Sequence, residues 1–200
     1  FNNNGTKMYI VGTETDDVQE FTLTTAFDIS TRTYDGDDSY DLDDKEVAPT
    51  SVKFNNDGTK MYMLGFTQNI HEYSLPAFDV SEASFEQSKT LTEITNLKPK
   101  DLEFNSDGTK MFIFDTSNIY VYTLSTAFDI STASYDNYAF STADYETSLT
   151  GFDFNDDGTV MFILGTQNDK VHEYYLSTGF DLTTASHVSS FSINGKDVQP

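Results

Sequence analysis

The sequence lacks cysteine and tryptophan and is poor in basic residues. Without cysteine it can form no disulfide and no thiolate metal site. No apolar run approaches the roughly 18 residues of a membrane-spanning helix, so we expect no membrane insertion. Only 11 Lys and Arg stand against 33 Asp and Glu, which gives a net charge of −22. Such a surface repels a phosphate backbone, so we expect no nucleic-acid partner.

The acidic excess also bears on where the protein works. A large negative charge keeps a protein soluble, and it is better tolerated where salt screens the repulsion between carboxylates. It disfavours binding to anionic membrane surfaces. We therefore expect an extracellular location, either secreted or on the surface of a cell or virion.

One stretch, Phe-Asn-x-Asp-Gly-Thr-Lys-Met-Tyr, recurs through the chain with small departures such as Asn4 in place of the Asp. Its copies begin at Phe1, Phe54, Phe104 and Phe154, so the period is about 50 residues. We divide the chain at these points into four repeats, 1–53, 54–103, 104–153 and 154–200.

Each repeat reads as four short strands. In the second repeat we predict them at 51–54, 60–65, 70–75 and 85–92. The Asp-Gly between the first two predicts a tight hairpin turn, because glycine accepts positive φ without strain. The second strand is apolar throughout, which indicates burial on both faces. The outer strand should be polar, and 37–44 in the first repeat has this character.

Four strands in a period of about 50 residues are typical of a β-propeller blade. We therefore predict an all-β chain of four four-stranded antiparallel blades. Three arrangements stay open: the four blades belong to a larger ring, they close on themselves, or two chains pair into one ring. We favour part of a larger ring, because rings of four blades are the low extreme.

The pattern resembles a known repeat. The Asp-Gly-Thr-Lys-Met-Tyr stretch, followed by Glu-Tyr-x-Leu-Ser-Thr and Phe-Asp-Ile-Ser, is similar to propeller repeats of marine bacterial surface and secreted proteins and of phage structural proteins. More distantly it resembles YVTN-type and lactonase propellers. The resemblance covers the whole chain and implies the fold. It carries over no catalytic residue, because these repeats serve many roles.

Several residues are candidate sites. The run 35–46 holds six Asp and one Glu, so calcium at Asp35, Asp37 and Asp38 is one interpretation and a solvated edge is the other. We expect no other cofactor. His71 and His172, each followed by Glu, suggest a metal or an acid–base pair, although we favour a structural role.

Two further features have structural interpretations. We expect His187 to be an exposed residue of the outer strand. The recurring Phe-Asp-[Ile/Val/Leu]-[Ser/Thr] is predicted to be a packing anchor followed by an Asx-type turn, with an aromatic sugar platform as the alternative. It occurs at Phe27, Phe78, Phe128 and Phe180.

We predict a non-catalytic binding or structural module that recognises a protein or glycan through loops that differ between repeats. One alternative is a structural subunit that assembles through propeller packing. Another is a fragment of a lactonase-like hydrolase with its active site in other blades. The candidate binding residues lie in the turns between second and third strands: Glu14, Asp16, Asp17, Phe66, Gln68, Asn69, Asp115, Asn118, Gln167, Asn168 and Asp169.

Overall fold

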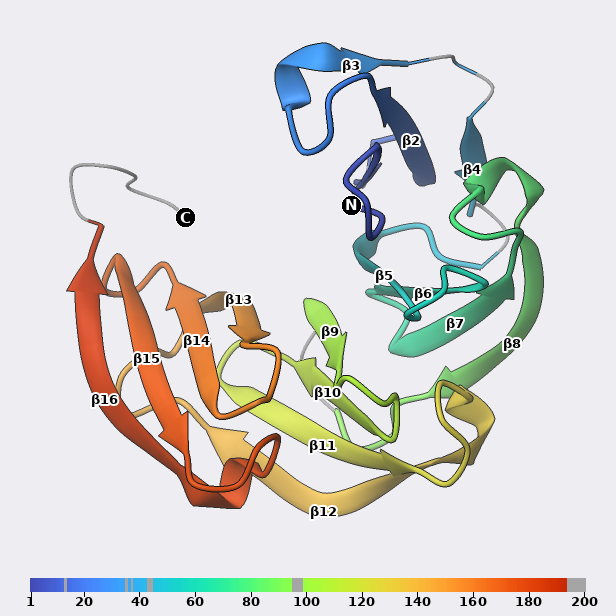
Figure 1. Ribbon diagram of the computed structural model, residues 1–200. Coiled ribbons are helices and arrows are strands. Elements are labelled where there is room, and N and C mark those ends of the chain that lie inside the picture. Colours follow the sequence, from blue (N-terminus) through green and yellow to red (C-terminus); the bar gives the residue numbers. More distant parts are fainter. Residues whose placement is uncertain (13, 35, 37, 43–44, 95–98, 194–200) are drawn as a thin grey trace. The chain divides into compact units, whose positions relative to one another are not determined.

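The computed structural model describes residues 1–200 apart from 13, 35, 37, 43–44, 95–98 and 194–200. The described residues form sixteen strands and four single turns of 3-10 helix. The strands make four antiparallel sheets of four strands each, which confirms the predicted blades (Figure 1). No helix among the described residues is long and apolar enough to cross a membrane.

Each sheet is one blade. Blade 1 consists of β1 (Lys7–Val11), β2 (Asp17–Leu23), β3 (Arg32–Thr33) and β4 (Ser39–Asp41). Blade 2 consists of β5 (Pro49–Phe54), β6 (Lys60–Gly65), β7 (Asn69–Ser74) and β8 (Ser84–Thr90). Blade 3 consists of β9 (Asp101–Phe104), β10 (Lys110–Phe114), β11 (Asn118–Leu124) and β12 (Ala133–Ser141). Blade 4 consists of β13 (Leu149–Phe154), β14 (Val160–Gly165), β15 (Lys170–Leu176) and β16 (Ala185–Ser192).

We name the strands of blades 2 to 4 A to D in chain order, which is also their order across each sheet. In blade 1, β1 and β2 correspond to strands B and C. Of the outer strand predicted at 37–44, the described residues form β4, and the earlier β3 pairs with β2 as well. Between them Gly36 takes a φ of 78°, a turn conformation that interrupts the strand. Residues 37, 43 and 44 of the predicted strand lie outside the described part.

The Asp-Gly turn and the Phe-Asp motif of one blade lock together. In blade 2 Gly58 takes a φ of 71°, as the hairpin predicted, and its carbonyl accepts the N–H of Phe78 at 2.8 Å. The Phe78 ring lies so close over Gly58 that a Cβ there would come within 2.2 Å of it. The same pairing recurs in the other blades between Gly5 and Phe27, Gly108 and Phe128, and Gly158 and Phe180. The motif is therefore the predicted packing anchor.

The Asx-type turn that follows this anchor is also present. In blades 1, 3 and 4 the Asp side chain caps a short 3-10 turn by accepting the N–H two residues on. The Asp28 carboxylate, for example, accepts the Ser30 N–H at 3.0 Å. The turns are η1 (Ile29–Thr31), η2 (Val80–Glu82), η3 (Ile130–Thr132) and η4 (Leu182–Thr184).

The chain divides into two compact units, Phe1–Thr92 and Glu93–Pro200, with two blades in each. In blades 1 and 3, the sheet face that packs on the following blade is named the forward face, and the opposite face the back face. In blades 2 and 4, the face that packs on the preceding blade is the back face, and the opposite face is the forward face. Blade 1 packs its forward face on the back face of blade 2 around Val18, Leu42, Met61 and Met63. The second unit repeats this arrangement around Phe112, Phe114, Met161 and Ile163.

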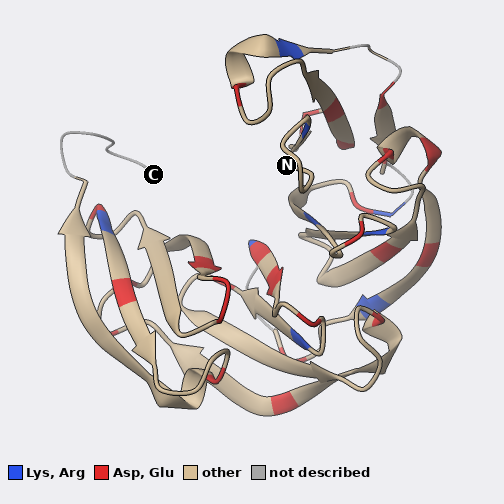
Figure 2. Ribbon diagram, in the orientation of Figure 1, with Lys and Arg blue, Asp and Glu red and all other residues tan. Residues whose placement is uncertain are grey.

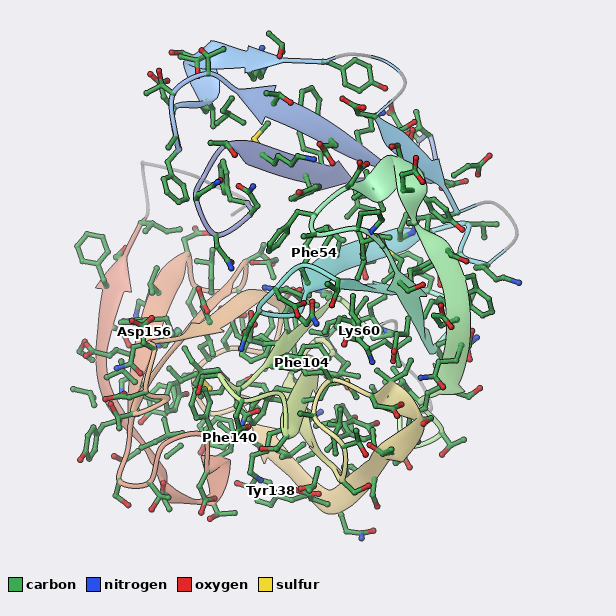
Figure 3. All side chains as sticks on the ribbon, turned by 45° about the vertical axis from the view of Figure 1, so that its right-hand side comes forward. Phe54, Lys60, Phe104, Tyr138, Phe140 and Asp156 are labelled. Atoms are coloured by element: carbon green, nitrogen blue, oxygen red, sulfur yellow. The ribbon has the colours of Figure 1, made fainter. Side chains whose placement is uncertain are left out.

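Two aromatic pairs recur at these seams between blades. Near strand A, Tyr9 packs on Phe54 with ring centroids 4.5 Å apart, and Phe112 packs on Phe154 at 4.9 Å. From the outer strands, Tyr40 meets Tyr73 edge-on at 5.2 Å, and Phe140 meets Tyr174 at 5.4 Å. Figure 3 labels Phe54 and, on β12, Tyr138 and Phe140. Both units thus use one packing scheme.

Candidate functional site

The turn between strands B and C of each blade is hydrogen-bonded to the segment that follows strand D. The backbone carbonyl of the turn accepts an N–H of this segment at 2.8–2.9 Å. The pairs are Asp16 with Leu42, Gln68 with Leu91, Ser117 with Thr142, and Asp169 with Ile193. We name this end of each blade the B–C end. The turn residues are thereby held on a rigid frame.

In blade 2 a buried carboxylate ties the incoming segment to the turn. Glu46 precedes β5 and is fully buried. One carboxylate oxygen, Oε1, accepts the Ala48 N–H at 3.0 Å. The other, Oε2, accepts the Thr67 N–H at 3.2 Å and the Thr67 hydroxyl. The side chain lies over Gly65, where a Cβ would come within 2.3 Å of it. Glycine therefore makes room for the carboxylate.

Blade 4 repeats this arrangement with one difference. Glu146 is fully buried over Gly165, and its Oε1 accepts the N–H of Ser148 at 2.8 Å and of Gln167 at 3.2 Å. Its Oε2 is buried and finds no hydrogen-bond partner among the described residues. In blade 4 a single carboxylate oxygen thus accepts both backbone N–H bonds, whereas in blade 2 each oxygen accepts one.

Blade 3 supplies the carboxylate from another position. Asp115 stands where blades 2 and 4 have glycine, at the end of strand B, and it is fully buried. Its Oδ1 accepts the N–H of Ser117 at 2.8 Å and of Asn118 at 2.9 Å, and Tyr120 donates its hydroxyl to Oδ2 at 2.9 Å. Burial, reinforced by this carboxylate, raises the pKa of Tyr120. A buried carboxylate is therefore common to the three blades.

A histidine lies near the carboxylate in blade 2. His71 is buried on β7, and its Nδ1 is 2.7 Å from the Ser88 hydroxyl. Its Nε2 and the hydroxyl of Tyr73 are buried, and neither finds a hydrogen-bond partner among the described residues. Burial lowers the pKa of His71, while the nearby Glu46 acts in the opposite direction. This placement agrees with the structural role that we favoured.

Blade 4 has the matching histidine, but its surroundings reach the surface. His172 is buried, with Nδ1 2.8 Å from the Ser190 hydroxyl, and burial lowers its pKa. The same hydroxyl lies 3.0 Å from Nε2 of His187. His187 is half-buried and stacks on Tyr145 with ring centroids 3.8 Å apart. The prediction of an exposed His187 was wrong because the neighbouring segment places Tyr145 against its ring.

The exposed side chains of the B–C ends differ in kind. Blade 2 exposes Val47 and Phe66 from adjoining segments, joined by the Phe66 N–H to Ala48 carbonyl bond of 3.2 Å. Blade 4 exposes Tyr145, and the Asn168 amide donates to the Tyr145 carbonyl at 2.8 Å.

Blade 1 is acidic at its B–C end, with Glu14 exposed and Asp17 half-buried. Figure 2 shows that acidic residues outnumber basic ones over the ribbon as a whole. The frame is therefore repeated while the surface that it carries varies.

The predicted binding residues fall into three groups. Exposed are Glu14, Phe66, Gln167 and Asn168. Half-buried are Asp16, Asp17, Gln68, Asn69, Asn118 and Asp169. Asp115 is buried, so its carboxylate holds the turn from within rather than facing solvent.

The acidic run 35–46 is not uniformly solvated. Asp35 and Asp37 of the calcium prediction lie outside the described residues, whereas Asp38 is half-buried and its carbonyl accepts the Glu20 N–H at 2.8 Å. Within the described ranges, no three His, Asp or Glu side chains are grouped as a metal site. Glu46, the last residue of this run, is buried, and its carboxylate accepts hydrogen bonds from the backbone N–H groups of Ala48 and Thr67.

Glu46 and Glu146 were missed as residues that shape the B–C end. A signal was present: both stand three residues before a strand A, and each is matched by a glycine at the end of the following strand B. Considered separately, Glu46 and Glu146 resemble the many other acidic residues expected at the surface.

No protein-family model matches the chain, and no curated protein matches it. Solved structures do. A protein from Lactobacillus plantarum aligns with a TM-score of 0.63 at 10% identity, over 93% of this chain and 52% of that one. The periplasmic gluconolactonase PpgL of Pseudomonas aeruginosa aligns with a TM-score of 0.60 at 11% identity, over 96% of this chain and 52% of its own.

A third match has a different role. Sqt1 of Chaetomium thermophilum, solved in complex with the N-terminus of a ribosomal protein, aligns with a TM-score of 0.57 at 16% identity. The alignment covers 96% of this chain and 48% of Sqt1. The chain thus spans about half the length of the solved structures that it matches. At these identities the likeness shows the β-propeller fold alone.

Proposed function

We propose that this chain is a non-catalytic binding module that works outside the cell, or on a cell or virion surface, and recognises a protein partner through the B–C ends of its blades. The observation that carries the proposal is the contrast at these ends. A buried carboxylate accepts backbone N–H bonds of the turn in both blades 2 and 4, while the exposed residues above it change from blade to blade. Rigid support under variable side chains is how repeat folds present recognition surfaces.

The exposed chemistry favours a partner with basic and apolar groups. The net charge of −22 attracts a basic surface and speeds its encounter. Val47 and Phe66 supply an apolar contact on one B–C end. Sqt1 supports this role, since that protein was solved in complex with the N-terminus of a ribosomal protein.

A display library of random peptides, selected on the immobilised chain, tests the proposal. We expect peptides rich in Lys, Arg and apolar residues to be enriched, and a Val47→Ser/Phe66→Ser double variant to lose them. Tyr175→Ser is the matched control, because Tyr175 is exposed but pairs with Val160 at the opposite end of blade 4. No enrichment over the input library, or enrichment that survives the double variant, would refute the proposal.

A glycan ligand is the second candidate, and blade 4 favours it. Tyr145 is 40% exposed, stacks on His187 and has Asn168 beside it, and an exposed aromatic ring with an amide nearby suits a sugar ring. A glycan array with the wild-type chain and Tyr145→Ala tests this candidate. Spots that bind the wild type and lose the variant support it, and a blank array with and without calcium ends it.

A further inference from the structure

Two sheet faces of the described chain expose apolar side chains at positions that are buried elsewhere. On the forward face of blade 4, Phe162 is 41% exposed and Phe191 is 69% exposed. The matching residue of Phe162 in blade 3, Phe112, is fully buried. A hollow over this face is lined chiefly by apolar groups of Phe162, Leu164 and Val171. This face therefore has the apolar composition of the faces that pack on a neighbouring blade.

The back face of blade 1 has the complementary character. Ile10 is 47% exposed, whereas its counterparts Met63 and Ile163 are at most 1% exposed. Phe27 and Ile29 are also exposed, at 60% and 57%. The residue that matches Ile29 in blade 4, Leu182, is only 2% exposed.

The two described seams define which residues meet. At the first contact, the aromatic residue of strand B meets the Phe that ends the next strand A, as in Tyr9 with Phe54 and Phe112 with Phe154. Blade 4 offers Phe162 for this contact, and blade 1 offers Phe1, which is 55% exposed.

At the second contact, an outer-strand aromatic residue meets an aromatic residue of the next strand C. The described pairs are Tyr40 with Tyr73 and Phe140 with Tyr174. In the strand registers, Tyr40 lies opposite Val18, Phe140 opposite Ile119 and Phe191 opposite Val171. Phe191 is therefore the third member of this series. Blade 1 supplies Phe21 at the position of Tyr73 and Tyr174.

We propose that the forward face of blade 4 docks on the back face of blade 1 of a second copy of this chain. Phe162 then packs on Phe1, and Phe191 on Phe21, of that copy. A second copy is the occupant that the observations specify, because this chain carries both halves of the contact. Phe162, Phe191 and Phe1 are exposed, and Phe21 is half-buried beside Tyr34. Exposed apolar surface of this extent is typical of interaction sites. The contact is head-to-tail, so it joins unlike faces of identical chains.

Sedimentation equilibrium of the chain over a range of concentrations tests the proposal. We expect the wild type to reach at least twice the mass of one chain. Phe162→Ser/Phe191→Ser and Ile10→Ser/Ile29→Ser should each remain at the mass of one chain. Tyr175→Ser should associate as the wild type does, because its counterpart Thr123 stays exposed even though blade 3 is covered by blade 4. Far-UV circular dichroism of each variant confirms that its blades are folded.

Mixing the two double variants provides the sharper test. Each variant alone lacks one half of the seam in every copy, but the mixture contains one intact forward face and one intact back face. We expect mass equal to two chains to return on mixing. A wild type that remains a single chain at every concentration, whether its faces stay open or close within one molecule, would overturn the proposal. So would a mixture that does not associate.

Discussion

The same substitution at two equivalent buried residues should have different consequences. In Glu46→Gln, one carboxylate oxygen becomes an NH2 group. Both oxygens of Glu46 accept backbone N–H bonds, Oε1 from Ala48 and Oε2 from Thr67, so either orientation of the amide points NH2 at an N–H donor. An unsatisfied buried donor costs about 1–3 kcal/mol, and weakening the remaining charge-assisted bond adds about 1 kcal/mol. We therefore expect Glu46→Gln to lower the free energy of unfolding by about 2–4 kcal/mol.

Glu146→Gln should be nearly neutral. Here Oε1 alone accepts the two N–H bonds, from Ser148 and Gln167, and an amide oxygen can take both. The NH2 group then replaces Oε2, an atom without a hydrogen-bond partner among the described residues. Loss of charge assistance in the two bonds is offset by removal of a buried charge, so we expect a change within about 1 kcal/mol.

Urea unfolding, followed by tyrosine fluorescence and far-UV circular dichroism, measures both variants. Because the chain has two compact units, amide exchange at Thr67 and Gln167 should accompany the unfolding curves and report on each blade separately. Exchange should accelerate at Thr67 in the first variant and change little at Gln167 in the second. Equal losses of stability in the two variants would refute the reasoning, because burial of a negative charge, rather than the direction of its bonds, would then decide the outcome.

Two further predictions concern the lock between turn and motif and the buried histidine. Gly58→Ala should cost about 2–4 kcal/mol from left-handed strain and the clash with Phe78, whereas Gly12→Ala, with no described atom within 4 Å of the added Cβ, should be nearly neutral in thermal unfolding. Burial lowers the pKa of His71, so between its folded and unfolded pKa values the unfolded state binds more protons, and stability present above the unfolded pKa of about 6.5 is lost as pH falls. His71→Gln, which installs the residue that blade 1 has as Gln19, should flatten the fall in melting temperature between about pH 7 and pH 5. An unchanged slope would contradict this account.

The blades could be predicted from sequence because they depend on local, repeated signals. Asp57-Gly58 requires positive φ, and the apolar run 60–65 requires cover on both faces. The turn and the strand are therefore each determined by residues that lie within a few positions of one another in the sequence. The outer strand of blade 1 was predicted less well, because Gly36 takes a positive φ between β3 and β4, whereas the polar pattern of this stretch resembles that of a continuous edge strand.

The residues under the B–C ends were harder to predict because their partners are distant in sequence. Glu46 is 21 residues from Thr67, and the residues around Glu46 do not indicate that its carboxylate accepts the Thr67 N–H. His187 was misjudged for a similar reason. Its stacking partner Tyr145 belongs to the segment before β13, and composition alone gives no hint of that contact.

The buried carboxylates of blades 2, 3 and 4 explain a correlation between two sequence positions, one before strand A and one at the end of strand B. Where strand B ends in glycine, as at Gly65 and Gly165, a Glu stands three residues before the preceding strand A. In blade 3, Asp115 directly follows strand B, and Asn96 stands 19 residues before it, the same spacing that separates Glu46 from Gly65 and Glu146 from Gly165. The N–H groups of the turn need one carboxylate, and there is room for only one, since a Cβ at either glycine would collide with the Glu side chain. Carboxylate and glycine should therefore alternate between these two positions in other repeats of this type, because each choice satisfies the same buried donors and excludes the other.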